Sequence, residues 1–140
     1  MKKICFNNLL ILSILIISCK NNDNNNEAKN ANVQGETTKI EFEKDFFDFG
    51  TIKRGEKVAY NFKFKNVGKE NLLIIDVIPT CGCTSPKWTK EIIPPDKEGR
   101  IEIVFDSSGY RGVQMKEIKV KSNSVRKELT LTIRANVLVE

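Results

Sequence analysis

The stretch VAYNFKFK, residues 58–65, decides the fold because it alternates apolar side chains with small or polar ones. Its apolar members are Val58, Tyr60, Phe62 and Phe64. A period of two places successive side chains on opposite faces of a strand, so that one face can be buried while the other meets water. The stretch therefore predicts a strand with one buried face.

The same period continues on both sides of this stretch, and no segment has the 3.6-residue period of a helix. Strands are expected at residues 40–42, 46–52, 58–65, 72–78, 101–105, 115–120 and 129–139. The run at 72–78 is apolar almost throughout, which predicts a central strand. Met115 breaks the parity of the next apolar positions, which predicts a bulge near residues 116–117. Seven or eight strands in about 100 residues predict an all-β, immunoglobulin-like sandwich, with a closed barrel as the alternative.

The N-terminal segment predicts export and lipidation. Residues 1–3 carry two lysines, and an apolar run follows at residues 9–17. This run is too short for a membrane helix, which needs about 20 residues. It leads into Ile16-Ile17-Ser18-Cys19, which resembles the bacterial lipobox and implies cleavage before Cys19 and acylation of that cysteine. Residues 1–18 are therefore a predicted lipoprotein signal peptide; an ordinary secretory signal that happens to contain a cysteine is the alternative.

The rest of the chain divides into a linker and one domain. Residues 19–38 are rich in asparagine and hold too few apolar groups to offset the entropy of ordering them, which predicts a disordered linker behind the lipid. Residues 39–140 then form one immunoglobulin-like domain, long enough for a single core. Acyl chains on Cys19 hold such a protein on a membrane. We therefore expect a location in the cell envelope, at the outer membrane or facing the periplasm.

Composition excludes several classes of chemistry. The chain has no histidine, which removes Cys–His dyads, Ser–His–Asp triads and mixed Cys/His zinc sites. Its formal net charge of +5 is too mild to indicate a nucleic-acid partner. It contains no phosphate-binding loop, nucleophile elbow or calcium loop. We therefore expect a non-enzymatic protein with no catalytic residue, no cofactor and no metal.

Several motifs together resemble the bacterial family named domain of unknown function 1573. They are Phe47-Asp48-Phe49-Gly50-Thr51-Ile52, residues 62–66 with Gly68, Cys81-Gly82-Cys83-Thr84 with Pro86 and Trp88, and Gly99 followed by residues 101–107. The resemblance covers nearly all of residues 40–137. It implies an immunoglobulin-like sandwich related to pilus-chaperone and cilia-associated modules, of a kind common in Bacteroidota lipoproteins. It implies no biochemical activity, because none is assigned to the family.

The expected domain contains one closely spaced cysteine pair, Cys81 and Cys83. Residues i and i+2 of a flat strand lie about 6.5 Å apart, whereas the β-carbons of a disulfide approach to about 4 Å. A bond between the two cysteines therefore requires a bend at Gly82, which glycine permits. Pro79 and Pro86 flank the pair, which predicts a tight loop rather than a strand.

Three interpretations of Cys81 and Cys83 stay open. The first is a structural disulfide, or two half-buried thiols beside Trp88. The second is thiol–disulfide exchange with a partner. The third is a Cu(I) site, since Cu(I) prefers thiolate ligands. Thr84, Pro86 and Trp88 form the candidate binding loop, although a single tryptophan in a sandwich most often anchors the core.

These observations predict a membrane-anchored lipoprotein whose domain binds or scaffolds a protein partner in the envelope, through this loop or an adjacent strand edge. The alternative function is a thiol–disulfide or Cu(I)-handling accessory protein that uses Cys81 and Cys83. Acidic pairs lie at Glu41 and Glu43 and at residues 45 and 48, and we interpret them as solvated edge charges rather than catalytic carboxylates. The expected partners are a membrane, through the lipid, and a protein.

Overall fold

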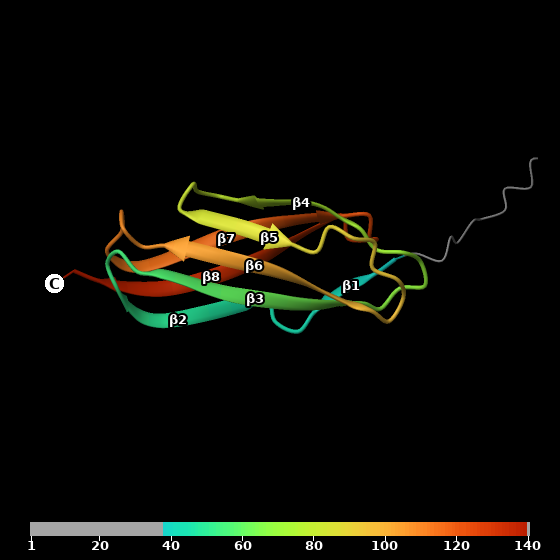
Figure 1. Ribbon diagram of the computed structural model, residues 1–140, viewed down its shortest axis with the longest axis horizontal. Coiled ribbons are helices and arrows are strands. Elements are labelled where there is room, and N and C mark those ends of the chain that lie inside the picture. The colour runs from blue at the N-terminus through green and yellow to red at the C-terminus, as the bar shows by residue number, and fades with distance from the viewer. Residues whose placement is uncertain (1–37, 140) are drawn as a thin grey trace, which may run out of the picture. The chain divides into compact units, whose positions relative to one another are not determined.

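The computed structural model describes residues 38–139, and these contain eight strands and no helix (Figure 1). The strands are β1 (Ile40–Phe42), β2 (Phe46–Lys53), β3 (Lys57–Asn66), β4 (Ile74–Pro79), β5 (Thr84–Trp88), β6 (Glu98–Asp106), β7 (Gly112–Ser122) and β8 (Glu128–Leu138). The predicted all-β sandwich of seven or eight strands is confirmed. The predicted signal peptide, the predicted lipidation site Cys19 and nearly all of the predicted linker lie outside the described residues.

The strands form two four-stranded sheets, ordered β1-β3-β6-β5 and β2-β8-β7-β4. β1 pairs antiparallel with β3, whereas β2 pairs parallel with β8. The chain therefore changes sheet in the short bend between Phe42 and Phe46, which Figure 1 shows between β1 and β2. It changes sheet again between β4 and β5, because these two strands are edges of different sheets.

The core lies between the two sheets and is built from the inward side chains of each strand. Phe62, Phe64 and Phe105 are at most 1% exposed, and they pack with the inward residues of β6 and β8. Burying one such side chain stabilises a fold by about 1.5–3 kcal/mol. The alternation that predicted a strand at residues 58–65 thus corresponds to real burial, with Val58 and Tyr60 half-buried at its outer end.

The strand at Ile74–Pro79 is an edge strand, and the prediction of a central strand there was wrong. Its apolar appearance has a local cause. The pairing of β4 with β7 shifts between Ile74 and Asp76, so Ile75 is the extra residue of a bulge. Ile75 is 59% exposed, and its side chain adds nothing to the core. A run that is apolar almost throughout is therefore compatible with an edge strand when one member sits in a bulge.

The predicted bulge near residues 116–117 is also absent, since β7 pairs with β8 without a shift from Gly112 to Lys121. Met115 lies opposite Arg134 and is 61% exposed, so its side chain is on the outward face of β7 and not on the face of Ile118 and Val120. Val139, the last residue of the predicted final strand, is exposed and follows the last residue of β8.

Candidate functional site

The cysteine pair lies in the connection where the chain crosses from β4 to β5. A disulfide joins Cys81 to Cys83, with their Cα atoms 5.3 Å apart. The hydroxyl of Thr84 lies 3.5 Å from the sulfur of Cys81 and 3.7 Å from that of Cys83. Thr84 is only 4% exposed, and the backbone N–H of Asp106 donates to the carbonyl of Cys83 at 2.9 Å. The connection is therefore fixed against β6.

Asp106, whose backbone bonds this connection, also carries a carboxyl group close to it. The pKa of this carboxyl group does not suit proton transfer at neutral pH. Hydrogen bonds from Ser108 and the ammonium of Lys57, 3.2 Å away, lower the pKa of Asp106 to about 2. A general base for neutral pH needs a pKa closer to 7. Within residues 38–139, no group of three or more Cys, Asp or Glu side chains could hold a metal ion.

Thr84, Pro86 and Trp88 belong to β5, and Pro79 is the last residue of β4. The prediction that the two prolines lie in a loop was therefore wrong. Trp88 is half-buried, packs against the core and carries the ammonium of Lys90 5.3 Å from its ring centre. The core-anchor interpretation of Trp88 therefore describes its position well. Thr84, Pro86 and Trp88 thus lie on a strand rather than in a loop, and binding through them stays a prediction.

Pro86 fits in β5 because it occupies an outward position of an edge strand. Asp106 on β6 donates to the carbonyl of Cys83, and Thr89 donates to the carbonyl of Arg100 on β6. The odd-numbered residues from 83 to 89 therefore turn their backbone groups towards β6. In an antiparallel pair the alternate residues then face away. Thr84 gives its N–H to the carbonyl of Cys81, and Pro86 has none. Within β5, all of which the structure describes, Trp88 alone keeps an outward N–H.

The edge of β4 is blocked in a similar way. The N–H of Thr80 donates to β7, so the backbone groups of Val77 and Pro79 lie on the side of β4 that faces away from β7. The N–H of Val77 is taken by the carboxylate of Asp76 at 2.9 Å, Pro79 has no N–H, and Ile75 forms the bulge. We call the side formed by β4 and β5 the closed flank, because bulges and prolines of this kind prevent strand addition.

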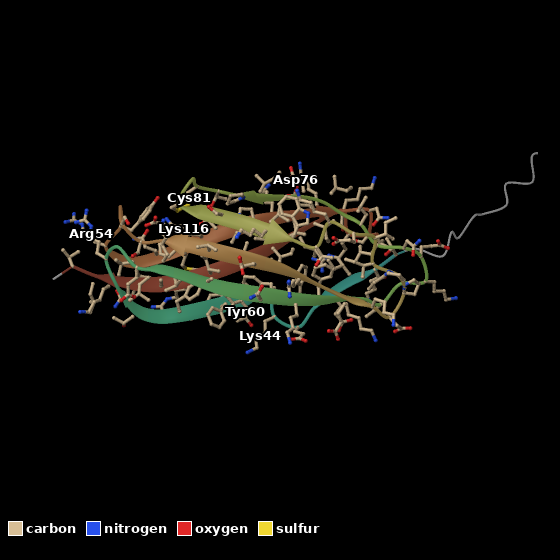
Figure 2. The ribbon with its side chains drawn as sticks, viewed as in Figure 1. Lys44, Arg54, Tyr60, Asp76, Cys81 and Lys116 are labelled. Carbon is tan, nitrogen blue, oxygen red and sulfur yellow. A yellow bond between two sulfur atoms is a disulfide. The ribbon has the colours of Figure 1, made fainter. Side chains whose placement is uncertain are left out.

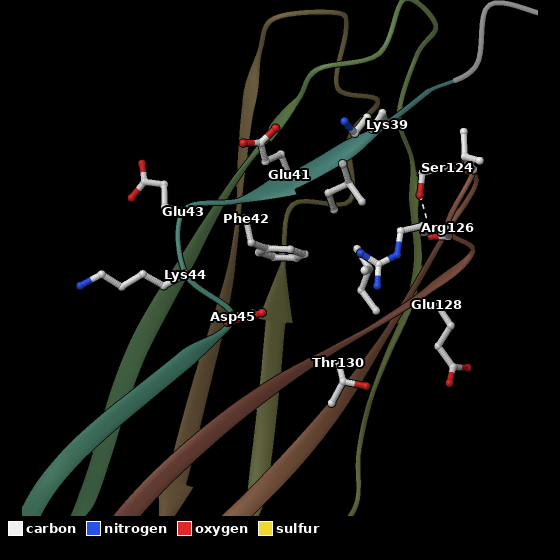
Figure 3. Close-up of a pocket in the computed structure, with 13 residues that line it drawn as sticks. Lys39, Glu41, Phe42, Glu43, Lys44, Asp45, Ser124, Arg126, Glu128 and Thr130 are labelled. Carbon is white, nitrogen blue, oxygen red and sulfur yellow. Dashed lines mark hydrogen bonds between the residues drawn. The ribbon is translucent and has the colours of Figure 1, made fainter.

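The opposite side is different. Figure 2 shows Asp76 and Cys81 on the closed flank and Tyr60 and Lys44 on the other side. There the segment of residues 38–45 passes from the edge of β3 to the edge of β8, and two hydrogen bonds hold its ends. The N–H of Val125, in the turn before β8, donates to the carbonyl of Thr38 at 3.1 Å, and the N–H of Thr132 on β8 donates to the carbonyl of Asp45 at 2.8 Å. Between these bonds lies a cavity of about 740 Å³, lined by residues 39–45 and residues 124–130 apart from Lys127 (Figure 3). We call it the seam cavity.

One wall of the seam cavity is the outer edge of β1. The carbonyl of Lys39 accepts from the N–H of Val67, directly after β3, and the N–H of Glu43 donates to the carbonyl of Lys63 on β3. The backbone groups of Lys39 and Glu43 therefore face β3. The residues between them alternate, which turns the N–H and C=O groups of Ile40 and Phe42 away from β3. β1 is the last strand of its sheet, and these groups therefore face the seam.

The other wall is the first part of β8. Lys127 accepts a hydrogen bond from β7 at 3.0 Å, so Glu128 and Thr130 turn their backbone groups to the opposite side. β2 begins to pair with β8 only at Thr132, opposite Phe46. In the described part of the chain, the outward N–H and C=O groups of Glu128 and Thr130 thus have no neighbouring strand.

Sequence reasoning missed the seam cavity. The acidic pair Glu41 and Glu43 was interpreted as solvated edge charge, and both residues are indeed exposed. A signal was nevertheless present, since the polar residues 43–45 interrupt two apolar segments and mark the change of sheet. Nothing in residues 124–130 indicates that this turn faces that bend.

Comparison with known proteins supports the fold. Residues 40–137 match the family described as protein of unknown function DUF1573. A protein of unknown function from Porphyromonas gingivalis W83 superposes with a TM-score of 0.64 at 18% identity, covering 72% of this chain and 47% of that one. The ASH/PapD-like domain 7 of human CEP192 superposes with a TM-score of 0.58 at 15% identity, covering 75% and 89%.

Other comparisons add the fold alone. The VesB protease of Vibrio cholerae superposes with a TM-score of 0.55 at 13% identity, over 70% of this chain but 31% of that chain. The chain thus spans about half of the Porphyromonas protein and less of the protease. None of the curated proteins is significantly similar in sequence. Within residues 38–139, no helix has the length and apolar character needed to cross a membrane.

Proposed function

Because the chain belongs to the DUF1573 family of proteins of unknown function, we propose that it is a membrane-anchored envelope lipoprotein whose β-sandwich binds a protein partner. The observation that carries this proposal is the pair of uncovered strand edges on β1 and β8. Uncovered N–H and C=O groups are a template for strand addition by another chain. The closed flank carries prolines and a bulge, so partner binding is expected on the seam side.

The proposed location at a membrane rests on the N-terminal sequence. Residues 1–18 have the charge and apolar run of a signal peptide, and Cys19 ends a lipobox-like motif. Lipid chains contribute about 0.8 kcal/mol per buried methylene, and two or more of them hold a protein on a membrane. Anchoring at Cys19 keeps the sandwich within reach of envelope proteins and supports a binding or scaffolding role without catalysis.

Site-specific photo-crosslinking tests this proposal. A photoreactive amino acid at Thr130 of the full-length chain, irradiated in intact cells, is expected to give a discrete adduct of higher mass. The matched control places the same group at Lys87, an exposed residue of the closed flank, and is expected to give none. Adduct formation is measured on denaturing gels and by mass spectrometry. Equal adducts at Thr130 and Lys87 contradict the proposal.

The Cys19→Ser chain tests the anchor in the same cells. It is expected to incorporate no labelled palmitate and to lose the Thr130 adduct, because the sandwich no longer stays at the membrane. Palmitate on the Cys19→Ser chain, or an adduct that is unchanged without the lipid, argues against an anchored binding module.

A second candidate function is thiol–disulfide exchange or Cu(I) handling, and the half-exposed disulfide of Cys81 and Cys83 favours it. Under the preferred function, replacing both cysteines by serine leaves the Thr130 adduct intact. It lowers the free energy of unfolding by less than about 2 kcal/mol, because so short a loop restricts the unfolded chain little. Denaturant unfolding checks the stability.

Under the second function, a Cys83→Ser chain traps a mixed disulfide with a partner through Cys81, which a reductant-sensitive adduct reveals.

A further inference from the structure

We infer that the seam cavity binds a short extended peptide, which adds as a strand to the open edge of β8 and places a glutamate carboxylate against Arg126. This inference rests on the proposed function and deepens it. It names the site, the backbone groups that hold the partner and the charge that the partner carries. Four features of the seam support it.

The first feature is the size of the seam. The hydrogen bonds at Thr38 and Asp45 leave six residues between them, residues 39–44, and the matching interval of the other wall is residues 126–131. Six residues of strand span about 20 Å at about 3.3 Å per residue. The cavity volume of about 740 Å³ is in the range of known ligand sites. A peptide of about six extended residues therefore fits between the two bonds.

The second feature is the hydrogen-bonding pattern of β8. β2 already pairs with the second part of β8, from Thr132 onward. Glu128 and Thr130 continue the same row of outward backbone groups before that point. An incoming strand can pair there without displacing any existing strand, because β1 belongs to the other sheet. The peptide lengthens an edge that the chain itself covers only in part.

The third feature is an apolar contact surface inside the cavity. Phe42 is half-buried, with its ring centre 5.4 Å from that of Phe64, and Leu129 is half-buried on the opposite wall. Val125 is 63% exposed at the turn between β7 and β8. Side chains of a bound strand point alternately to its two faces. Those on the inner face can pack against Phe42 and Leu129.

The fourth feature is a rigid turn that carries Arg126. Ser124 donates its hydroxyl to the carbonyl of Arg126 at 2.7 Å, and the hydroxyl of Ser122 donates to that of Ser124 at 2.9 Å. Both serines are at most 3% exposed. These bonds hold the backbone of the turn, and the exposed side chain of Arg126 extends from it. The backbone of the turn is thus organised before a ligand arrives.

The guanidinium of Arg126 lacks an anionic partner in the described chain. No carboxylate of residues 38–139 forms an ion pair with it. Figure 3 shows Arg126 pointing across the cavity towards Phe42, whereas Glu43, Lys44 and Glu128 point away from that space. An arginine fork binds a carboxylate through two parallel charge-assisted hydrogen bonds. A glutamate side chain of the bound strand supplies that carboxylate.

Peptide binding to the full-length, detergent-solubilised chain tests the inference. The probes are fluorescent seven-residue peptides of alternating valine and threonine, blocked at both ends, with one glutamate placed at each position in turn. Fluorescence anisotropy measures their affinity. At least one glutamate peptide is expected to bind at least about fivefold more tightly than the same peptide with glutamine. If no glutamate peptide exceeds its glutamine counterpart, the inference is overturned.

Two matched pairs of variants separate backbone from side-chain effects. Thr130→Pro removes an outward N–H without removing a bond of the β7–β8 ladder, and it is expected to weaken the best peptide at least about tenfold. Thr130→Val keeps the N–H and is expected to bind within about twofold of the natural chain. Arg126→Gln is expected to abolish the preference for glutamate, whereas Arg111→Gln, in the turn before β7, leaves it unchanged.

Unfolding midpoints measured for all four variants show whether the sandwich remains intact. A folded Thr130→Pro chain that binds like the natural one overturns the inference, as does an Arg126→Gln chain that still prefers glutamate. If either occurs while the Thr130 crosslink persists in cells, this inference falls and the proposed function stands. If the crosslink is also missing, both fall.

Discussion

Replacing Gly99 by alanine is expected to lower the free energy of unfolding by about 2–3 kcal/mol, because the added methyl group has no space. A Cβ at this position would contact Cζ of Phe64, lie 2.8 Å from its Cε2 and lie 2.9 Å from Cδ1 of Ile93. Phe64 is 1% exposed and Ile93 is 2% exposed, so neither side chain can move into water. Close-packed interiors do not absorb a methyl group without shifts of this kind.

The control for this prediction is Gly109→Ala, in a turn where an added Cβ meets nothing within 4 Å. Its unfolding free energy is expected to stay within about 0.5 kcal/mol of the natural value. Trp88, the single tryptophan, is half-buried and reports denaturant unfolding by its fluorescence. A second variant, Phe64→Leu combined with Gly99→Ala, is expected to lose less than the two single changes together, since leucine lacks Cζ. A cost for Gly99→Ala no larger than that for Gly109→Ala contradicts the steric argument.

The sequence predicted the buried strands well because their pattern is local. Phe62 and Phe64 on β3, and Leu131 and Ile133 on β8, alternate with outward residues, and all four are at most 1% exposed. Such periodicity depends only on strand geometry and on having one buried face. It gave the fold class and the inward residues without knowledge of which strands are neighbours.

The errors concern residues whose environment depends on a distant strand. Ile75 is exposed because β4 bulges against β7 at the edge of the sheet. Met115 differs, because it lies on the outward face of an unbroken strand. No local pattern states where a neighbouring strand ends. Pro86 was placed in a loop for the same reason, since only the pairing with β6 shows that its position faces outward.

The candidate site was also predictable only in part. The bend at Gly82 that a disulfide between Cys81 and Cys83 requires follows from distances along a strand, and the structure joins the two sulfurs. The seam cavity instead depends on contacts between Thr38 and Val125 and between Asp45 and Thr132, which are far apart in sequence. It arises because the chain changes sheet between β1 and β2, and this is a property of topology.

Replacing Asn66 by leucine is expected to lower the free energy of unfolding by about 3–5 kcal/mol, the largest single effect that we predict. Asn66 is fully buried, and its side-chain amide donates to the carbonyls of Ile93 at 2.9 Å and Glu70 at 2.8 Å. Its side-chain oxygen accepts from the N–H of Gly68 at 3.0 Å and from the hydroxyl of Thr38 at 3.2 Å. Leucine has a similar size but satisfies none of these four groups.

The cost of Asn66→Leu arises from the backbone groups that it leaves behind. Each buried donor or acceptor without a partner costs about 1–3 kcal/mol, and the amide serves two carbonyls and one N–H of the backbone. Asn61→Leu on the exposed face of β3 is the matched control, expected to stay within about 0.5 kcal/mol. Thr38 also bonds the turn that carries Arg126, so Asn66→Leu is expected to weaken the Thr130 crosslink, whereas Asn61→Leu leaves it intact. A loss below about 1 kcal/mol in denaturant unfolding contradicts this account, because the four bonds then contribute no more than an exposed network does.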